Sequence, residues 1–355
     1  MQRHLLLAVL VFASLLAGVP RSQAQSALLD LPRASQRARV AQRVGITDVT
    51  ITYHRPLVAG RKIWGGVVPY GQPWRAGANE NTIIEFTDPV TVEGQPLAAG
   101  KYGLHMVPAE GDWTVAFSKT NTAWGSFSYD KAEDALRVTV KPHPSEMHEA
   151  LIWDFDEVTP NSTTAVLKWE KLAIPFKIEV NTLEISQKKL TAQLRGIQQY
   201  TWVSWDEAAN YLVDSKGNLE NALKDADTSI QNEERFENLI TKAKVLDAMS
   251  RKDDASAARA KAMEMGTVVQ VHIYGRQLMA QGHQDQGFDI FRGNMKKYPN
   301  HWLAHGEASR IASAKGDFDT ATKEIKLAIA AAPEPQKPQL NGLLKRLESK
   351  EDINK

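Results

Sequence analysis

The chain has 355 residues, a formal net charge of +1 and no cysteine. A near-neutral charge argues against general nucleic-acid binding, which needs a strong basic excess. The absence of cysteine excludes disulfides, thiol catalysis, cysteine-ligated metal sites and a lipoprotein anchor. The length and a hydrophobic content of 43% suffice for two domains, each with its own core.

Residues 1–24 are predicted to be a signal peptide. A basic start precedes an apolar run from Leu5 to Val19, and Ser22 and Ala24 follow at the small-residue positions of a cleavage site. The alternative is a membrane anchor, but the run is short for crossing a bilayer. We therefore expect cleavage after Ala24, export to the periplasm or the medium, and a mature protein without a membrane span.

After a lead-in over residues 25–47, residues 48–180 are predicted to form a β-sandwich domain. Short segments with alternating apolar and polar residues recur there at even spacing. The connections carry turn residues and are too short for the crossover helices of a parallel sheet. This pattern favours an antiparallel β-sandwich or jelly roll. The expected strands are residues 48–53, 81–86, 90–93, 101–107, 113–118, 136–141, 149–155, 163–169 and 173–180.

From residue 181 the composition changes to helix-forming residues at helical spacing. The fold class is therefore predicted to be α+β multidomain, with an all-α C-terminal part. We expect a linker helix over residues 181–196 and helical repeats over residues 197–335. A C-terminal helix and a frayed polar tail are expected over residues 336–355.

The repeats have a period of 34 residues, which separates Gly282 from Gly316 and Pro299 from Pro333. Each glycine is expected in the tight turn of a helix pair, and Gly217 lies in a similar context. The second unit, residues 236–265, carries Arg251 and Lys252 in place of the turn glycine. The period resembles tetratricopeptide repeats, which implies stacked helix hairpins with a groove for a peptide or protein partner. Trp202, Trp205, Tyr211 and Tyr274 either line that groove or fill the seams between helices.

The stretch from Tyr53 to Thr82 concentrates cationic and aromatic side chains between proline and glycine residues, which predicts a long loop. The planar guanidinium group of arginine can bind a carboxylate, sulfate or phosphate, and aromatic rings can pack on a sugar or an aromatic ligand. Alternatively, the arginines bond loop carbonyls, stack on the aromatics and lock the loop in place. The candidate ligand-binding residues are Arg55, Arg61, Trp64, Tyr70, Trp74, Arg75 and Asn79.

An ordered series of motifs starts in this loop: Y-x-R-P, G-R-x-I-W-G, V-P-Y-G and W-R-x-G-A-N-E-x-T, then A-G-K-Y-G-L and W-G-S-F-S-Y-D. The series resembles the exported bacterial family called domain of unknown function 2911, over about residues 34–180. The resemblance implies a β-rich exported domain of unsettled activity. His105 and Met106 depart from the pattern, because a more apolar or hydroxyl pair is expected there, so no role for His105 carries over.

Catalysis would require a carboxylate near the arginines, and Glu80 is the candidate acid or base. Known nucleophile, phosphate-loop and dinucleotide motifs are absent, and no cofactor or metal is expected. Weaker candidates for acid–base work are the spaced carboxylates Glu85, Asp154 and Asp156. His143, Glu146, His148, His301 and His305 could ligate a metal, but they match no ligand signature.

The sequence predicts an exported two-domain protein of unknown function. The leading interpretation is non-catalytic binding of a small anionic or sugar-like ligand by the β domain, with protein docking by the helical repeats. The alternative is a hydrolase-type enzyme with Glu80 as acid or base and arginines holding an anionic substrate. Convergence of Arg55, Arg75 and Glu80 in one pocket would favour a ligand or substrate site, and guanidinium groups bonded to carbonyls would favour a scaffold.

Overall fold

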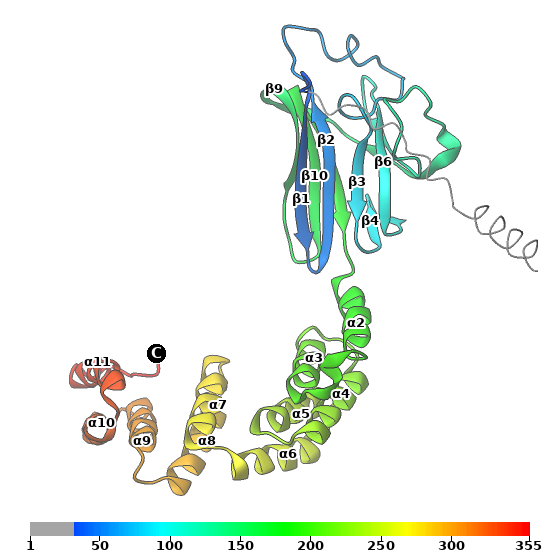
Figure 1. Ribbon diagram of the computed structural model, residues 1–355. Helices are drawn as coiled ribbons and strands as arrows, with labels where there is room; N and C mark the ends of the chain where they lie inside the picture. The colour runs from blue at the N-terminus through cyan, green and yellow to red at the C-terminus, as the bar shows by residue number, and fades with distance from the viewer. Residues whose placement is uncertain (1–31) are drawn as a thin grey trace, which may run out of the picture. The chain divides into compact units, whose positions relative to one another are not determined.

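The structure is a computed structural model that describes residues 32–355, so the predicted signal peptide lies outside the described residues. The chain divides into two compact units, a β unit that ends at Thr182 and a helical unit that begins at Leu183 (Figure 1). Within residues 32–355, no helix is long and apolar enough to cross a membrane.

The β unit consists of two antiparallel sheets, as the alternating sequence pattern predicts. One has six strands in the order β1-β2-β3-β6-β7-β8, and the other has four in the order β5-β4-β10-β9 (Figure 1). The strands are β1 Gln36–Val44, β2 Thr47–Arg55, β3 Thr82–Phe86, β4 Val90–Val92, β5 Gln95–Leu97, β6 Gly100–Val107, β7 Trp113–Ser118, β8 Asp134–Val140, β9 His143–Asp156 and β10 Ser162–Glu179. A short 3-10 helix, η1 Lys131–Glu133, precedes β8.

The core of the β unit lies between the two sheets. Phe117 of β7 meets Phe176 of β10 edge to face, with ring centroids 5.6 Å apart, and Trp153 of β9 meets Phe176 at 5.9 Å. These side chains are at most 3% exposed. Burying each one contributes on the order of 1.5–3 kcal/mol, and the edge-to-face contacts add to that.

Several strand predictions differ from the structure. The short strand β5 was not expected, and β9 begins at His143 rather than at residue 149. Residues 36–44 of the expected lead-in form β1, which pairs with β2 along its whole length. The small alanines of β1 weaken the apolar alternation that marks a strand. The strands expected at residues 163–169 and 173–180 are one continuous β10. The register of β10 shifts around Glu170, whose φ of 54° marks a bulge rather than a turn between two strands.

The outer face of the six-stranded sheet, opposite the core, is partly covered by residues 119–133, here called the cover segment. The backbone of the cover segment passes close over β6, since a Cβ added at Gly103 would lie 2.3 Å from the carbonyl oxygen of Thr120. Glycine is therefore required at this position for the segment to cross the sheet.

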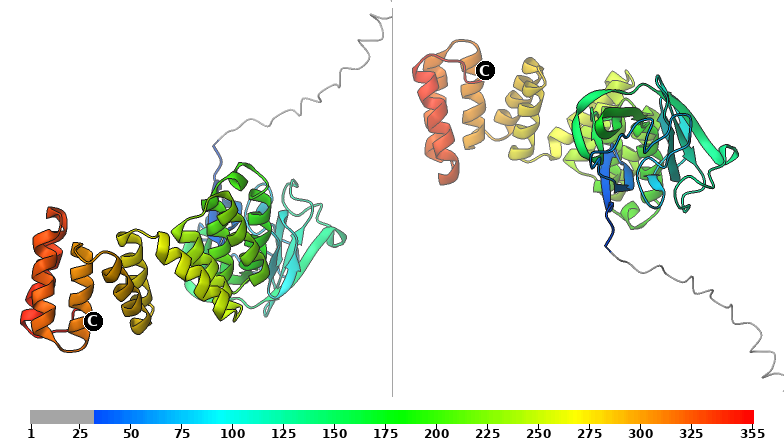
Figure 2. Two further views of the ribbon diagram at one scale, coloured as in Figure 1. Left: turned by 90° about the horizontal axis from the view of Figure 1, so that it is seen from below. Right: turned by 90° about the horizontal axis from the view of Figure 1, so that it is seen from above.

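The helical unit is built from helix hairpins that follow one another in chain order (Figure 2). The first helix α2 is followed by four antiparallel pairs, α3/α4, α5/α6, α7/α8 and α9/α10, and then by α11. The helices are α2 Thr182–Gln193, α3 Trp202–Asp214, α4 Leu219–Asn232, α5 Phe236–Ala248, α6 Lys252–Met265, α7 Val268–Ala280, α8 Gln284–Lys297, α9 Trp302–Ala314, α10 Phe318–Ala331 and α11 Lys337–Glu348, with 3-10 helices η2 Ile197–Tyr200 and η3 Glu334–Gln336.

A residue with positive φ ends the first helix of every hairpin. Lys216, Ser250, Gly282 and Gly316 occupy this position, at intervals of 34, 32 and 34 residues. The period is therefore real, but the equivalent of the turn glycine is Lys216 rather than Gly217, and Ser250 takes that place in the second unit. Lys350, after α11, has the same conformation another 34 residues on.

The C-terminal tail is docked rather than frayed, contrary to the prediction from its polar composition. Ile353 is 3% exposed. Its carbonyl oxygen accepts a hydrogen bond from Arg310 Nη1 at 3.0 Å, and Asn354 Nδ2 donates to the Arg310 carbonyl oxygen at 2.9 Å. The side chain of Ile353 and the buried Arg310 thus fix the C-terminal tail, which its polar composition alone predicts to be frayed.

Candidate functional site

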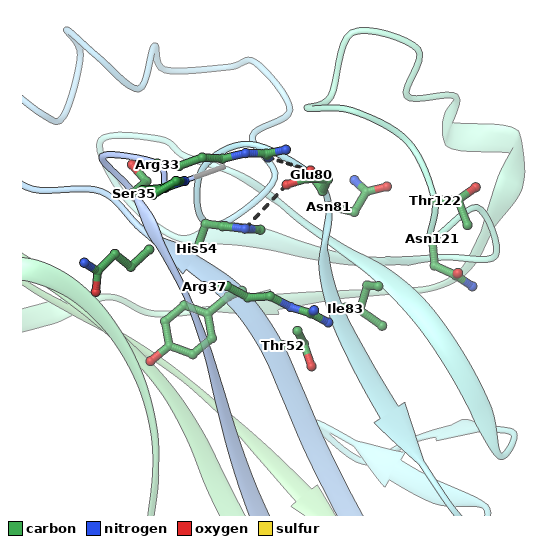
Figure 3. A pocket seen from close by; sticks show the side chains of 13 residues that line it. Arg33, Ser35, Arg37, Thr52, His54, Glu80, Asn81, Ile83, Asn121 and Thr122 are labelled. Carbon is green, nitrogen blue, oxygen red and sulfur yellow. Dashed lines mark hydrogen bonds and ion pairs between the residues drawn. The ribbon is translucent and has the colours of Figure 1, made fainter. Parts of the chain in front are cut away.

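A pocket of about 640 Å³ opens on the outer face of the six-stranded sheet, beside the cover segment (Figure 3). Alternation along β2 buries Tyr53 in the core and turns Thr52 and His54 to the outer face, where they meet the pocket. Residues 32–37 form one side and residues 121–122 another. The full lining is Pro32, Arg33, Ser35, Gln36, Arg37, Thr52, Tyr53, His54, Glu80, Asn81, Ile83, Asn121 and Thr122.

Glu80 is held between a cation and an imidazole at one end of the pocket (Figure 3). Arg33 Nη1 donates to Glu80 Oε1 at 2.6 Å, and His54 Nε2 lies 3.5 Å from Glu80 Oε2. The Arg33 guanidinium also lies over the Trp124 ring, 5.4 Å from its centroid. The carboxylate is therefore partly neutralised and fixed in place.

The surroundings of the site keep Glu80 ionised, and burial keeps His54 neutral. Burial by itself raises the pKa of Glu80, but hydrogen bonds from Arg33 and from its own backbone outweigh burial and lower that pKa. Burial lowers the pKa of His54, and the charges of Arg33, Arg37 and Arg75 lower it further against the opposing effect of Glu80. At neutral pH the site thus contains one carboxylate, three guanidinium groups and a neutral imidazole.

Arg37 and Arg75 are cations without a partner. Neither makes a hydrogen bond or ion pair within residues 32–355, and the Nε of Arg75 is buried. The Arg37 side chain extends across the pocket toward Ile83 (Figure 3). Arg75 is placed beside His54 and Glu80 because Gly77 packs closely on β2, where an added Cβ would lie 3.2 Å from the His54 carbonyl oxygen.

Two of the candidate arginines are part of the scaffold. Arg55 Nε donates to the Leu151 carbonyl oxygen at 3.0 Å. Arg61 Nε donates to the Val58 carbonyl oxygen at 3.1 Å, and its Nη2 donates to that of Leu57. Of the expected trio Arg55, Arg75 and Glu80, the structure therefore brings Arg75 and Glu80 together and directs Arg55 elsewhere.

The aromatic candidates are packed or lie away from the pocket. Trp64 meets Trp74, Trp113 and Trp169 with ring centroids 5.0–5.9 Å apart, which places Trp64 and Trp74 in a buried tryptophan cluster. Tyr70 is exposed and packs over Gly65. None of the three lines the pocket, and their role is to hold the long loop.

Two asparagines join the segments around the pocket. Asn79 Nδ2 donates to the Ser35 carbonyl oxygen at 3.1 Å, which ties residues 32–37 to the loop before β3. Asn81 is buried; its Oδ1 accepts from Ala123 N at 2.8 Å and its Nδ2 donates to the Gly125 carbonyl oxygen at 3.1 Å. The candidate Asn79 is therefore a positioning residue, and Asn81 anchors the cover segment.

The weaker carboxylate and histidine candidates have local structural partners. Glu85 lies 3.6 Å from Lys101, and Asp154 and Asp156 both face Lys168. Within the described chain no cluster of three histidine, aspartate or glutamate residues is placed to hold a metal. His143, Glu146 and His148 belong to β9 rather than to a loop, His301 caps α9 at its N-terminus, and His305 bonds Glu324.

Of the aromatic candidates of the repeats, Trp202, Tyr211 and Tyr274 pack in the seams between helices, and Trp205 lines a pocket beside α2. Trp205 Nε1 donates to the Gln199 carbonyl oxygen at 2.8 Å, and the Tyr274 ring lies 6.2 Å from that of Phe236. Arg235 covers the Trp202 ring at 5.9 Å, and Tyr211 packs against the cluster around Leu212. All four are half-buried.

Sequence reasoning missed Arg33, Arg37, His54 and Asn81 as site residues. His54 is the unspecified position of Y-x-R-P, and Arg37 lies in the unrecognised strand β1. The available signal was the run of arginines at every second or fourth residue, Arg33, Arg37, Arg39 and Arg43. Such spacing puts the last three on one face of a strand.

Residues 35–178 match the family model described as Protein of unknown function (DUF2911). The match covers nearly all of the described part of the β unit. No curated protein matches the chain. A solved structure that resembles it is the crystal structure of the APC/C hetero-tetramer Cut9-Hcn1, with 17% identity and a TM-score of 0.29 over 48% of this chain and 33% of that chain. The chain thus spans about one third of that protein's length, and so low a score gives no functional information.

Proposed function

We propose that this is an exported protein whose β unit binds a small anionic or sugar-like ligand without catalysis, while its helical unit docks a protein partner. The observation that carries the ligand proposal is the cationic pocket. Arg37 extends across it without a partner, Arg75 lies beside it without a hydrogen bond, and its one carboxylate, Glu80, is already paired with Arg33. Guanidinium groups in this state favour a carboxylate, phosphate or sulfate.

The rest of the lining favours a ligand that also carries hydroxyl groups. Ser35, Gln36, Thr52, Asn121 and Thr122 supply hydroxyl and amide groups around the arginines. Such a set of small polar donors and acceptors fits a sugar acid or a sugar phosphate better than a bare inorganic anion.

A hydrolase is the second candidate, because His54 contacts Glu80 at the pocket. Two features argue against it. The lowered pKa of Glu80 leaves no proton on the carboxyl for a general acid to deliver at neutral pH. The Nδ1 of His54 is buried without a partner, so the nitrogen that Glu80 does not contact is not presented to a substrate.

Protein docking by the helical unit is supported by an exposed stripe on α7. Val269 and Ile273 are about half exposed, and Arg276 follows at the next position on the same helix face. The face of α7 that carries Gly275 packs on Phe291 of α8, so the stripe faces away from its hairpin partner. Exposed apolar side chains with a charged neighbour are typical of a protein interaction surface.

Thermal melts with and without anions test the ligand proposal. We expect phosphate, sulfate or galacturonate to raise the melting temperature of the wild-type chain, since a ligand at about a hundred times its Kd adds roughly 2.7 kcal/mol. Neutral galactose should act more weakly than galacturonate. Arg37→Met should abolish the anion effect. Arg75→Met should weaken it while stability holds or rises, because a half-buried cation without a hydrogen-bond partner is removed.

Arg55→Met is the matched control. It should lower stability by about 1–3 kcal/mol, because the Leu151 carbonyl oxygen loses its donor, yet keep the anion effect. The absence of any anion effect in the wild type would reject the pocket. Hydrolysis of a glycoside or ester substrate that disappears in Glu80→Gln would establish the enzyme instead.

A further inference from the structure

A second pocket lies in the helical unit, between α2 and the first hairpin α3/α4. Its volume of about 350 Å³ falls within the range of small-molecule sites. All of its residues belong to the unit that begins at Leu183, so it is separate from the pocket of the β unit. The lining is Gln187, Leu190, Thr191, Leu194, Arg195, Trp205, Leu212, Asn221, Lys224 and Asp225.

One side of this pocket is a fixed apolar wall. Leu194 and Leu212 are at most 8% exposed, so they form a rigid base. The Trp205 side chain is oriented by the hydrogen bond from its Nε1 to the Gln199 carbonyl oxygen. Because the indole nitrogen already has a partner, what Trp205 offers to an occupant is the flat apolar ring.

Asp225 provides a carboxylate that the chain itself does not neutralise. It is half-buried and makes no hydrogen bond or ion pair in the part of the chain that the structure describes. Burial raises the pKa of Asp225 to about 6, against the opposing effect of the Lys224 charge. A desolvated carboxylate gains most from a cationic hydrogen-bond donor.

Two cations line the same pocket without partners. The Arg195 guanidinium and the Lys224 ammonium make no hydrogen bond or ion pair within residues 32–355. The pocket therefore presents, next to an apolar wall, one carboxylate that attracts a cationic group and two cations that attract an anionic group. A purely anionic ligand would be repelled by Asp225, and a purely cationic one by Arg195 and Lys224.

We propose that this pocket binds a free α-amino acid with an apolar side chain. The ligand's ammonium donates to Asp225, its carboxylate accepts from Arg195 and Lys224, and its side chain packs on Trp205 and the leucines. An apolar amino acid is a small molecule that carries both charges close together on an apolar body, which is the combination this lining complements. The inference stands apart from the proposed function, since no residue is shared with the pocket of the β unit.

Isothermal calorimetry on the full chain tests the proposal with L-leucine, L-phenylalanine and three compounds that each lack one feature of the ligand. L-Leucine should bind, as should L-phenylalanine if Trp205 supplies the wall. Leucinamide lacks the carboxylate, N-acetylleucine lacks the cationic ammonium, and glycine lacks the apolar side chain. We expect each loss to weaken binding at least about tenfold, the change that corresponds to one charged or well-packed contact. Leucinamide and N-acetylleucine binding as tightly as L-leucine would overturn the assignment.

Substitutions locate the site. Asp225→Asn should lose L-leucine binding, while the control Asp227→Asn should keep it, because Asp227 lies on the same helix but pairs with Lys242 at 2.7 Å. Unchanged helical circular dichroism would show that Asp225→Asn is folded. Equal affinity of Asp225→Asn and the wild type would overturn the proposal, as would the absence of binding heat with both L-leucine and L-phenylalanine.

Discussion

The arginines of the β unit differ in what their guanidinium groups contact, although several belong to one loop. Arg55 and Arg61 point at carbonyl oxygens that would otherwise lack a donor, so they stabilise the loop. Arg37 and Arg75 have no such acceptor in the described chain, so their guanidinium groups add no hydrogen bond to the loop. Whether an arginine donates to a carbonyl oxygen depends on where the folded chain places its carbonyl groups. A sequence motif does not give those positions.

His105 is a buried imidazole whose surroundings favour the neutral form. It is 2% exposed, its Nδ1 lies 2.8 Å from Ser126 Oγ, and its Nε2 lies 3.5 Å from Asn81 Nδ2. Because Asn81 Nδ2 can only donate, Nε2 is the acceptor and Nδ1 carries the proton. Burial lowers the pKa of His105 to about 4, and the charge of Asp134 opposes that shift.

This pKa predicts a loss of stability in mild acid. Between pH 6.5 and pH 4, His105 is protonated in the unfolded chain but stays neutral in the folded chain. The free energy of unfolding therefore falls as pH falls. A shift of this size corresponds to about 3 kcal/mol at most. Urea denaturation of the wild type and His105→Gln at pH 7.5 and pH 4.5 measures it, and the variant should show the smaller pH dependence.

Carboxyl groups titrate equally in the wild type and in His105→Gln. Comparing how much the free energy of unfolding changes with pH in the two proteins therefore removes the effect of the carboxyl groups. If the wild type and His105→Gln lost the same free energy between the two pH values, His105 would not be the neutral buried group described above. The absolute stability of the variant does not enter this comparison, because only the slope with pH is compared.

The site shows how far residues can be inferred from motifs. Glu80 and Arg75 were found because they stand in a dense motif next to small residues. His54 and Arg37 were not, because they face the pocket only through the pairing of β1 with β2, where Arg37 lies opposite His54. A sequence gives the alternation of a strand, but the register between two strands is set by contacts across the whole sheet.

At the scale of elements, the helical unit repeats a conformation rather than a residue. Each first helix of a hairpin ends at a residue with positive φ, and the next residue's N–H returns to a carbonyl oxygen in the helix, as in His283 N to Leu278 O and Asp317 N to Ala312 O. Glycine adopts this conformation freely, whereas Lys216 and Ser250 adopt it at a cost.

Replacing glycine at this position should therefore lower stability, and introducing glycine there should raise it. Gly282→Val and Gly316→Val should each cost about 1–3 kcal/mol, and Lys216→Gly and Ser250→Gly should each add about 0.5–1 kcal/mol. A Cβ at Gly282 or Gly316 meets no atom within 4 Å, so any loss comes from the backbone conformation alone. Chemical denaturation monitored by circular dichroism measures these changes.

Gly306 is the control for this series. It lies inside α9, where a Cβ also meets nothing within 4 Å, but its φ is that of a helix. Gly306→Ala should stabilise by roughly 0.5–1 kcal/mol, because alanine is the better helix former. Equal melting temperatures for Gly282→Val, Gly316→Val and the wild type would contradict the role of the turn.

The elements that the sequence identified best are those with a strong period. Alternation revealed most strands and the 34-residue interval revealed the hairpins. The misses have different causes. β1 pairs with the adjacent β2 but is hidden by its small alanines, and β10 continues through a bulge at Glu170. Only the docked tail depends on a partner distant in sequence, Arg310. The tail of residues 351–355 reads as polar, yet Ile353 finds a buried place beside Arg310 that composition cannot show.

At the scale of the whole molecule, each unit has a core of its own. The β unit is closed by contacts between its two sheets, such as Phe117 with Phe176. The helical unit is held by separate clusters along the stack, one of which joins Ile325 and Leu340 to Ile353. Because these cores contain no shared residue, neither unit requires the other to bury its apolar side chains.

We therefore predict that the units fold separately when the chain is divided after Thr182. This point keeps the hydrogen bond from Thr182 Oγ1 to the Pro160 carbonyl oxygen at 3.2 Å within the β fragment. Residues 26–182 should be soluble with β circular dichroism, and residues 183–355 should be helical, each with a cooperative melt. The anion effect on melting should remain with the β fragment and the L-leucine effect with the helical one. A β fragment that is unfolded, or an anion effect that needs both fragments mixed, would show that the division into independent units is wrong.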